Sequence, residues 1–239
     1  MRFDVLAAMN GERAARRACV LVTEMPGGEQ RFVKAADLAS DPLAEILEAS
    51  LRTGKSGMVE HEGRSYFLTV QAPPARLIVI GAVHITQALA PMARVAGFDL
   101  TIIDPRTAFA TLERFPDVTL IADWPQEIIP TLGLDRYTAV ACFTHDPKID
   151  DPGIEAALSA ECFYVGALGS RKTHGNRVQR LKEKGFSDEQ IARIKAPIGV
   201  DIGAVSPAEI AVSVLAEIVL SLRKKPLRAD APQRAGAAA

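Results

Sequence analysis

Short apolar runs recur through the later part of the chain, and most are separated by stretches whose apolar residues follow a helical period. Continuous apolar runs of this length are typical of strands buried on both faces, and the helical stretches would supply the crossovers between them. The pattern therefore predicts an α/β fold, a parallel sheet with helices on both faces. The expected strands are 77–81, 100–104, 118–122, 138–143 and 162–167, and the last helix is expected at Pro207–Arg223.

The first 72 residues show a different pattern, which predicts a small α+β domain. Turn residues at Pro26–Gly28 and Glu62-Gly63 indicate two hairpins, and helices are expected over Phe3–Arg17 and from Asp41-Pro42 to Leu51. The prolines within 71–75 indicate a domain boundary. The predicted domains are 1–72 and 73–225, followed by a disordered tail over 226–239.

Composition excludes several classes of function. Lysine plus arginine total 28 against 29 for aspartate plus glutamate, so no overall charge favours nucleic acid or an anionic membrane. No apolar run approaches the ~20 residues of a membrane span, and no signal peptide is evident, so a cytoplasmic protein is expected. Cys19, Cys142 and Cys162 form no C-x-x-C pair and are expected to be buried thiols. No metal site is predicted.

The predicted sheet also predicts where a ligand binds. In open parallel sheets, ligands bind beyond the carboxyl ends of the strands, where the strand order reverses. If the order is 3-2-1-4-5, the loops after Gly81 and after Phe143 face each other across this crevice. Gly81 opens a turn like that of a dinucleotide-binding fold, but Val83 and Thr86 stand where that motif has its second and third glycines.

Three polar residues near this turn are candidates for cofactor binding. His84 begins the following helix and could hydrogen-bond an anion, or it could be an ordinary residue of the helix start. Asp104 follows Gly81 by 23 positions, close to the spacing of a ribose-binding acid, and we favour that role over the alternative of capping the turn at Pro105. Arg106 could accept a phosphate or be solvated.

The residues Thr144, His145 and Asp146 follow the fourth predicted strand and form the candidate chemical centre. A histidine beside a carboxylate can be held in one tautomer and can move a proton. The alternative is that Asp146 caps the next helix and that His145 is merely exposed.

Two further segments are expected at the same crevice. Gly169, Ser170 and Arg171 open a helix with a hydroxyl and a cation, which indicates an anion site, and we favour Ser170 and Arg171 over Lys172 and His174. The glycine-rich loop that contains Gly199, Asp201 and Gly203 is expected to form a lid or wall. Capping boxes are expected at Ser187–Gln190 and Ser206–Glu209.

Several of these segments together resemble a known family. From Leu77 to Leu222 the chain carries VIGAVHI, IDPR, RFP, THD, YVGALGSRK and API-G-DIGA-SPAEIA in this order. In these motifs it is similar to the XdhC/CoxI family, the accessory proteins of xanthine dehydrogenase and carbon monoxide dehydrogenase type molybdenum hydroxylases. It differs from the family pattern in having Gly27-Gly28-Glu29 where members carry a glycine-glycine-cysteine motif.

The resemblance implies a Rossmann-like domain and a maturation factor. Such a protein binds the molybdenum cofactor (molybdopterin) and assists its sulfuration or its insertion into a molybdenum hydroxylase apo-subunit, together with cofactor-modifying enzymes. It would be a chaperone more than an enzyme, and a homodimer is left open. The phosphate of the pterin, or of its dinucleotide form, would be the anion at the Gly81 and Ser170 helix starts.

Two other functions remain open at this point. The first is an NAD(P)-binding oxidoreductase in which His145 and Asp146 transfer the proton; Asp104 favours it, whereas Val83 and Thr86 oppose it. The second is a protein-binding scaffold whose crevice holds no ligand.

Overall fold

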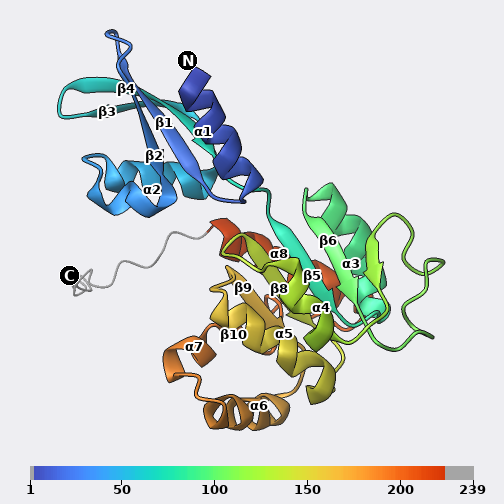
Figure 1. Cartoon of the computed structure of the whole chain (residues 1–239). Helices are drawn as coiled ribbons and strands as arrows, with labels where there is room; N and C mark the ends of the chain where they lie inside the picture. The colour runs from blue at the N-terminus through green and yellow to red at the C-terminus, as the bar shows by residue number, and fades with distance from the viewer. Residues whose placement is uncertain (1–2, 224–239) are drawn as a thin grey trace, which may run out of the picture. The chain divides into compact units, whose positions relative to one another are not determined.

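The computed structural model describes residues 3–223, which divide into two compact units. One unit is built from the chain up to Ala72, and the other spans Pro73–Leu222 (Figure 1). The tail predicted for residues 226–239 lies outside the described residues.

The first unit is an antiparallel sheet of four strands in the order β2-β1-β4-β3. Both predicted hairpins are present, and side chains alternate along β1, so that Val20 and Val22 pack with Leu47 while Leu21 packs with Met9. The elements are α1 (Phe3–Ala14), β1 (Cys19–Met25), β2 (Gln30–Lys34), a 3-10 helix (Ala35–Ser40), α2 (Ala44–Thr53), β3 (Gly57–His61) and β4 (Arg64–Gln71).

Both helices of this unit are shorter than predicted. Helix α1 ends at Ala14, before Arg17, because Arg16 has a left-handed φ of 52°. Helix α2 begins at Ala44, after Asp41, whose carboxylate accepts the N–H of Leu43 at 2.8 Å and follows a 3-10 turn. In both cases the helix boundary depends on the local backbone conformation, which the spacing of apolar residues does not reveal.

The second unit contains a parallel sheet of six strands in the order β10-β9-β8-β5-β6-β7. The predicted order of the first five strands is confirmed, with β5 paired to both β6 and β8. The sixth strand, β10, was not predicted, because two residues are too few to show a period. The strands are β5 (Arg76–Ile80), β6 (Asp99–Ile103), β7 (Thr119–Ile121), β8 (Thr138–Cys142), β9 (Tyr164–Ala167) and β10 (Ile194–Lys195).

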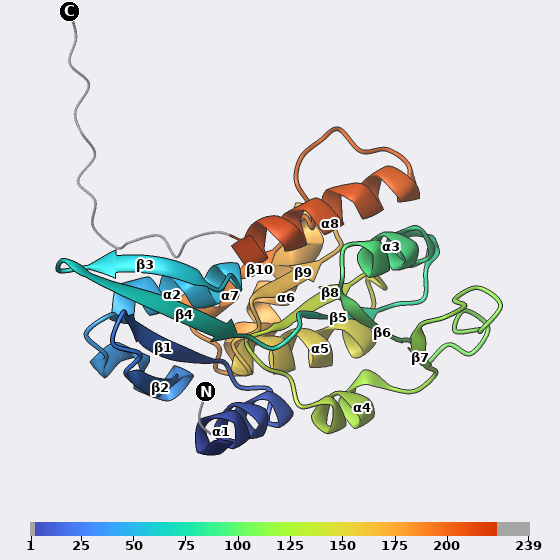
Figure 2. The same ribbon diagram turned by 90° about the horizontal axis from the view of Figure 1, so that it is seen from above.

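Helices cover both faces of this sheet, as predicted. Leu77 and Val79 of β5 pack in one core with residues of α3 and α8, whereas Ile78 and Ile80 pack in a second core with α5 and α6. Figure 2 shows α3 and α8 on one side of the sheet and α4 and α5 on the other. The helices are α3 (His84–Val95), α4 (Pro125–Leu132), α5 (Pro147–Ser159), α6 (Arg171–Glu183), α7 (Asp188–Ala192) and α8 (Pro207–Arg223).

The loop that leads into α8 is fastened to that helix. The Gly199 N–H donates to Glu217 Oε2 at 2.9 Å, and the Tyr164 hydroxyl donates to the same oxygen at 2.7 Å. Gly199 has a φ of 96°, and a Cβ at this position would overlap Ser213 Oγ. Position 199 therefore requires glycine both for its backbone conformation and for its close approach to α8.

We expect Gly199→Ala to lower the free energy of unfolding by about 2–4 kcal/mol, because it adds a steric overlap to an unfavourable φ. Gly97→Ala is the matched control, since Gly97 also has a positive φ, 83°, but no heavy atom within 4 Å of its added Cβ. The control should lose only about 1 kcal/mol. Urea unfolding of both variants measures the difference, and equal losses would show that the packing of this loop on α8 is not tight.

Candidate functional site

The loops after β5 and β8 meet at the carboxyl edge of the sheet. Gly81 directly follows β5, has a φ of 113° and donates its N–H to the Ile103 carbonyl at 2.9 Å. A Cβ on Gly81 would lie 2.9 Å from Thr144 Cγ2. Glycine is therefore needed where the two loops touch, and this contact lies where the sequence placed the crevice.

The turn after Gly81 is occupied by a side chain of the protein itself. Asp104 is fully buried, and its Oδ2 accepts the Ala82 N–H at 2.7 Å. The Arg106 guanidinium donates to both oxygens of the same carboxylate, at 2.9 and 2.7 Å. Burial by itself would raise the pKa of Asp104, but the hydrogen bonds from Arg106 and Ala82 outweigh it and hold the pKa below its ordinary value.

This arrangement weakens the NAD(P) alternative. The Ala82 N–H is the kind of donor that holds a pyrophosphate in a dinucleotide-binding turn, and here it is bound to Asp104. The Ala82 carbonyl in turn accepts from Arg114 at 2.9 Å. Asp104 is fully buried, so its carboxylate is not exposed to bind a ribose. Instead it links the Ala82 N–H to the Arg106 guanidinium inside the protein. His84, at the start of α3, is exposed.

The residues after β8 belong to the start of α5. Asp146 is the N-cap and accepts the Lys148 N–H at 2.9 Å, which is the capping role considered as its alternative. His145 is exposed and has a left-handed φ of 63°. The His145 main-chain N–H and the Thr144 hydroxyl both donate hydrogen bonds to the Asp150 carboxylate.

Asp150 is a site residue that the sequence analysis missed. It is 1% exposed and accepts from Thr144 Oγ1 at 2.7 Å, from the Thr144 N–H at 3.3 Å and from the His145 N–H at 3.0 Å. Burial raises the pKa of this carboxyl to about 6, against the opposing effect of the Thr144 hydrogen bonds. One signal could have revealed it, because Asp150 falls at helical spacing with Ile154 and Ala157 on the buried face of α5.

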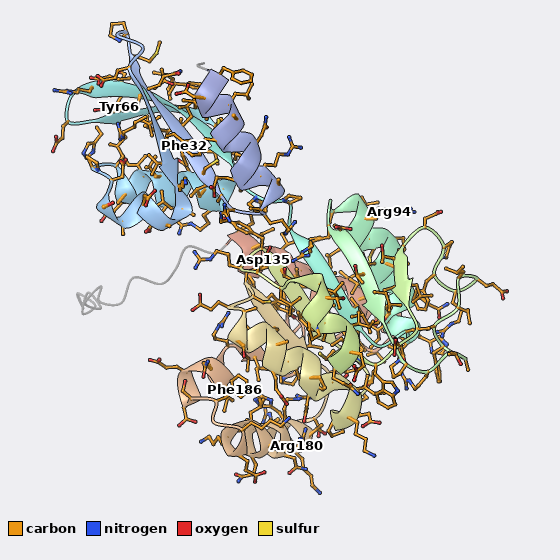
Figure 3. All side chains as sticks on the ribbon, in the orientation of Figure 1. Phe32, Tyr66, Arg94, Asp135, Arg180 and Phe186 are labelled. Carbon is orange, nitrogen blue, oxygen red and sulfur yellow. The ribbon has the colours of Figure 1, made fainter. Side chains whose placement is uncertain are left out.

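A pocket of about 290 Å³ lies between α5 and α6 beside Asp150. The α6 side of the pocket includes Lys172, Thr173 and Arg177, together with Arg180, which is labelled in Figure 3. Arg180 binds the Asp151 carboxylate through Nε at 2.6 Å and Nη2 at 3.1 Å. His145 lines the opposite side, so the pocket joins the fourth and fifth strand ends.

The pocket differs in two ways from what the sequence predicted at the start of α6. Ser170 is the N-cap, accepting the Thr173 N–H at 3.2 Å, and Gly169 precedes it with a φ of 142°. Arg171 is exposed, and the lining is supplied by Lys172 and Thr173 instead of the favoured Ser170 and Arg171. The helix start is therefore close to the pocket, but other side chains face it.

The loop that contains Gly199, Asp201 and Gly203 does not line this pocket. Ile198, at its start, packs in the core beneath α3 and α8, whereas α5 and α6 pack on the other core. Asp201 is exposed and accepts the Gly203 N–H at 3.3 Å. The α5–α6 pocket is therefore formed without this loop, and its expected role as a lid or wall of the crevice stays a prediction.

The three cysteines are free and buried. Burial raises the pKa of Cys19 to about 11 and that of Cys162 to about 12, and raises that of Cys142 well above its ordinary value. All three are therefore protonated and weakly nucleophilic at neutral pH. Within residues 3–223, no group of three or more His, Cys, Asp or Glu side chains is placed to hold a metal ion. No helix in the same range is long and apolar enough to cross a membrane.

The family model described as the XdhC Rossmann domain matches residues 77–218. The chain belongs to the XdhC family. The match begins one residue into β5 and covers the rest of the parallel sheet. The family resemblance drawn from the ordered motifs is thereby confirmed.

Relatives of this XdhC domain include proteins with assigned names. The chain is 35% identical over 146 residues to the Escherichia coli molybdenum cofactor insertion chaperone PaoD, a match covering 61% of this chain and 40% of that protein. It is 33% identical over 153 residues to a Bacillus subtilis protein named as a probable xanthine dehydrogenase subunit, covering 64% of this chain and 44% of that protein. It is also 35% identical over 159 residues to the E. coli protein YqeB, covering 65% and 29%.

A solved structure shares the fold. A crystal structure titled as a xanthine dehydrogenase from Bacillus halodurans superposes with a TM-score of 0.65 at 23% identity, covering 92% of this chain and 67% of that one. The matches to the named relatives span less than half of those proteins' lengths. Their activities as whole proteins are therefore not transferred to this chain by similarity alone.

We expect Asp150 to titrate near pH 6, which makes the protein less stable as the pH rises from about 4 to 7. The reason is that the folded state binds the proton more tightly than the unfolded state, whose carboxyl titrates near 3.8. The unfolding free energy of the wild type, relative to that of Asp150→Asn, should fall by about 3 kcal/mol over this range. Urea unfolding at several pH values measures it, and a relative stability that is constant or rises with pH would contradict the burial argument.

Proposed function

We propose that this chain is a maturation factor that binds the molybdenum cofactor and assists its insertion into a molybdenum hydroxylase of the xanthine dehydrogenase or carbon monoxide dehydrogenase type. The observation that carries the proposal is membership of the XdhC family, with a relative named as a molybdenum cofactor insertion chaperone. Its partners would be cofactor-modifying enzymes and the apo-form of the hydroxylase, and its compartment would be the cytoplasm.

The donor set in the second unit fits an anionic cofactor. Molybdopterin ends in a phosphate, and its dinucleotide form carries a diphosphate. The pocket between α5 and α6 includes Lys172, Arg177 and Arg180 and lies beside the first turn of α6, a position that favours anions. Nothing in this role requires the chain to carry out a reaction, so we propose a chaperone that binds and releases the cofactor.

The chemistry of the chain favours insertion over sulfuration as its contribution. A sulfur carrier needs an accessible thiolate, whereas Cys19, Cys142 and Cys162 are buried, and burial raises the pKa of each. Sulfur transfer to the cofactor would therefore have to come from a partner enzyme, while this chain holds the cofactor.

The proposal predicts that the protein retains one molybdopterin when the two are mixed without oxygen. Native mass spectrometry should show the added mass of a single cofactor, and the complex should activate an apo-hydroxylase faster than free cofactor does. A large excess of NAD⁺ or NADP⁺ should not displace the cofactor, because the Ala82 turn is closed by Asp104.

Failure to retain the cofactor, combined with no effect on hydroxylase activation, would overturn the proposed function. Displacement by NAD⁺ or NADP⁺ would instead support the oxidoreductase alternative.

A further inference from the structure

Arg177 is an arginine of α6 that is buried without adequate partners. Its side chain is 2% exposed and, among residues 3–223, makes one hydrogen bond, from Nη2 to the Leu168 carbonyl at 3.3 Å. Neither Nε nor Nη1 has a hydrogen-bond partner within the described part of the chain. A buried guanidinium with unmet donors is unfavourable, and native proteins nearly always satisfy such groups. Arg177 lines the pocket between α5 and α6, so a ligand there could provide the missing acceptor.

The acids of the pocket do not satisfy Arg177, because both are already bound. Asp150 accepts from Thr144 and His145, and the two oxygens of Asp151 accept from Nε and Nη2 of Arg180. Arg177 is close enough to lower the pKa of Asp150 electrostatically, yet the two make no hydrogen bond. The acceptor that Arg177 lacks would therefore have to come from a group other than these residues.

Several other features of the pocket also favour an anion. Helices α5 and α6, each of 13 residues, both begin beside it, since Pro147 and Thr173 from their first turns line its wall. The positive ends of two helix dipoles therefore point to the same region. Lys172 adds an exposed cation, so that three cations of the lining face two carboxylates.

The size of the pocket limits what it can hold. Its volume of about 290 Å³ is just below the ~300–1,000 Å³ that is typical of sites for whole small molecules. A phosphate or diphosphate group fits such a space, and the rest of a larger ligand would extend beyond it.

We propose that the pocket between α5 and α6 is a phosphate-binding subsite in which Arg177 is the principal ligand of the anion. Nε and Nη1 point to different edges of the guanidinium, so one of these two unpaired nitrogens would donate to a phosphate oxygen, and Lys172 and the first turn of α6 would complete the shell. That the anion is the phosphate or diphosphate of the molybdenum cofactor rests on the proposed function. The subsite lies one strand away from the Gly81 turn, where dinucleotide-binding folds hold their phosphates.

Isothermal titration of the full chain with inorganic phosphate and with pyrophosphate tests this subsite. We expect the wild type to bind at least one of the two probes, and Arg177→Met to weaken that binding by at least about tenfold, the loss expected for a charged hydrogen-bond pair. Lys172→Met should weaken it about threefold. Lys182→Met is the control on the same helix, because Lys182 pairs with Asp188 at 2.7 Å and does not line the pocket; it should bind within twofold of the wild type.

Thermal unfolding separates a ligand-binding Arg177 from a structural one. Methionine has a similar length and no unmet donors, so Arg177→Met without ligand should unfold at the same temperature as the wild type or a higher one. Pyrophosphate should raise the unfolding temperature of the wild type and not that of the variant. If Arg177→Met fails to fold, Lys172→Met and Asn176→Ala decide the question, since both residues line the pocket and are exposed.

Three results would overturn the subsite: no binding of either probe by the wild type, unchanged binding by Arg177→Met, or unchanged binding by both Lys172→Met and Asn176→Ala. This test is independent of the proposed function. Arg177-dependent pyrophosphate binding, with neither cofactor retention nor an effect on hydroxylase activation, would leave the subsite standing and overturn the proposed function. Unchanged pyrophosphate binding by Arg177→Met, with the cofactor retained by the wild type, would do the reverse.

Discussion

The pairing of β5 with both β6 and β8 is the constraint on which the second unit depends. Because β5 is central, the loops that leave it and β8 must pass each other at the carboxyl edge, and Gly81 touches Thr144 there. The same edge contains the ends of β6 and β9, which deliver Asp104 and the start of α6. This arrangement positions every candidate site residue except those of the loop that contains Gly199, Asp201 and Gly203.

The three charged groups buried at this edge differ in how far the protein satisfies them. Asp104 has a complete set of partners, and the hydrogen bonds from Arg106 hold its pKa below the ordinary value. Asp150 has partners but no ion pair, and burial raises its pKa to about 6. Arg177 lacks partners for two of its nitrogens. The Ala82 N–H of the Gly81 turn is thus already bound by Asp104, whereas the pocket between α5 and α6 contains Arg177 donors without an acceptor.

Much of the fold could be predicted from the sequence because apolar runs and cap residues are local signals. The first five strands of the parallel sheet, their order and the capping boxes at Ser187 and Ser206 are all confirmed. Less of the candidate site could be predicted. Asp150 and Arg177 lie inside helices, where a charged residue is ordinarily solvated, and only packing against neighbouring elements shows that they are buried. The sequence also does not show on which face of the sheet the loop that contains Gly199, Asp201 and Gly203 packs.

A crystal structure of the protein bound to molybdopterin would test the central claim most directly, because it shows where the cofactor's phosphate lies. We expect this phosphate between α5 and α6, within hydrogen-bonding distance of Arg177 Nε or Nη1, with the hydrogen bond between Asp104 and Ala82 intact. A phosphate bound at the Gly81–Val83 turn, with Arg177 still unpartnered, would contradict it.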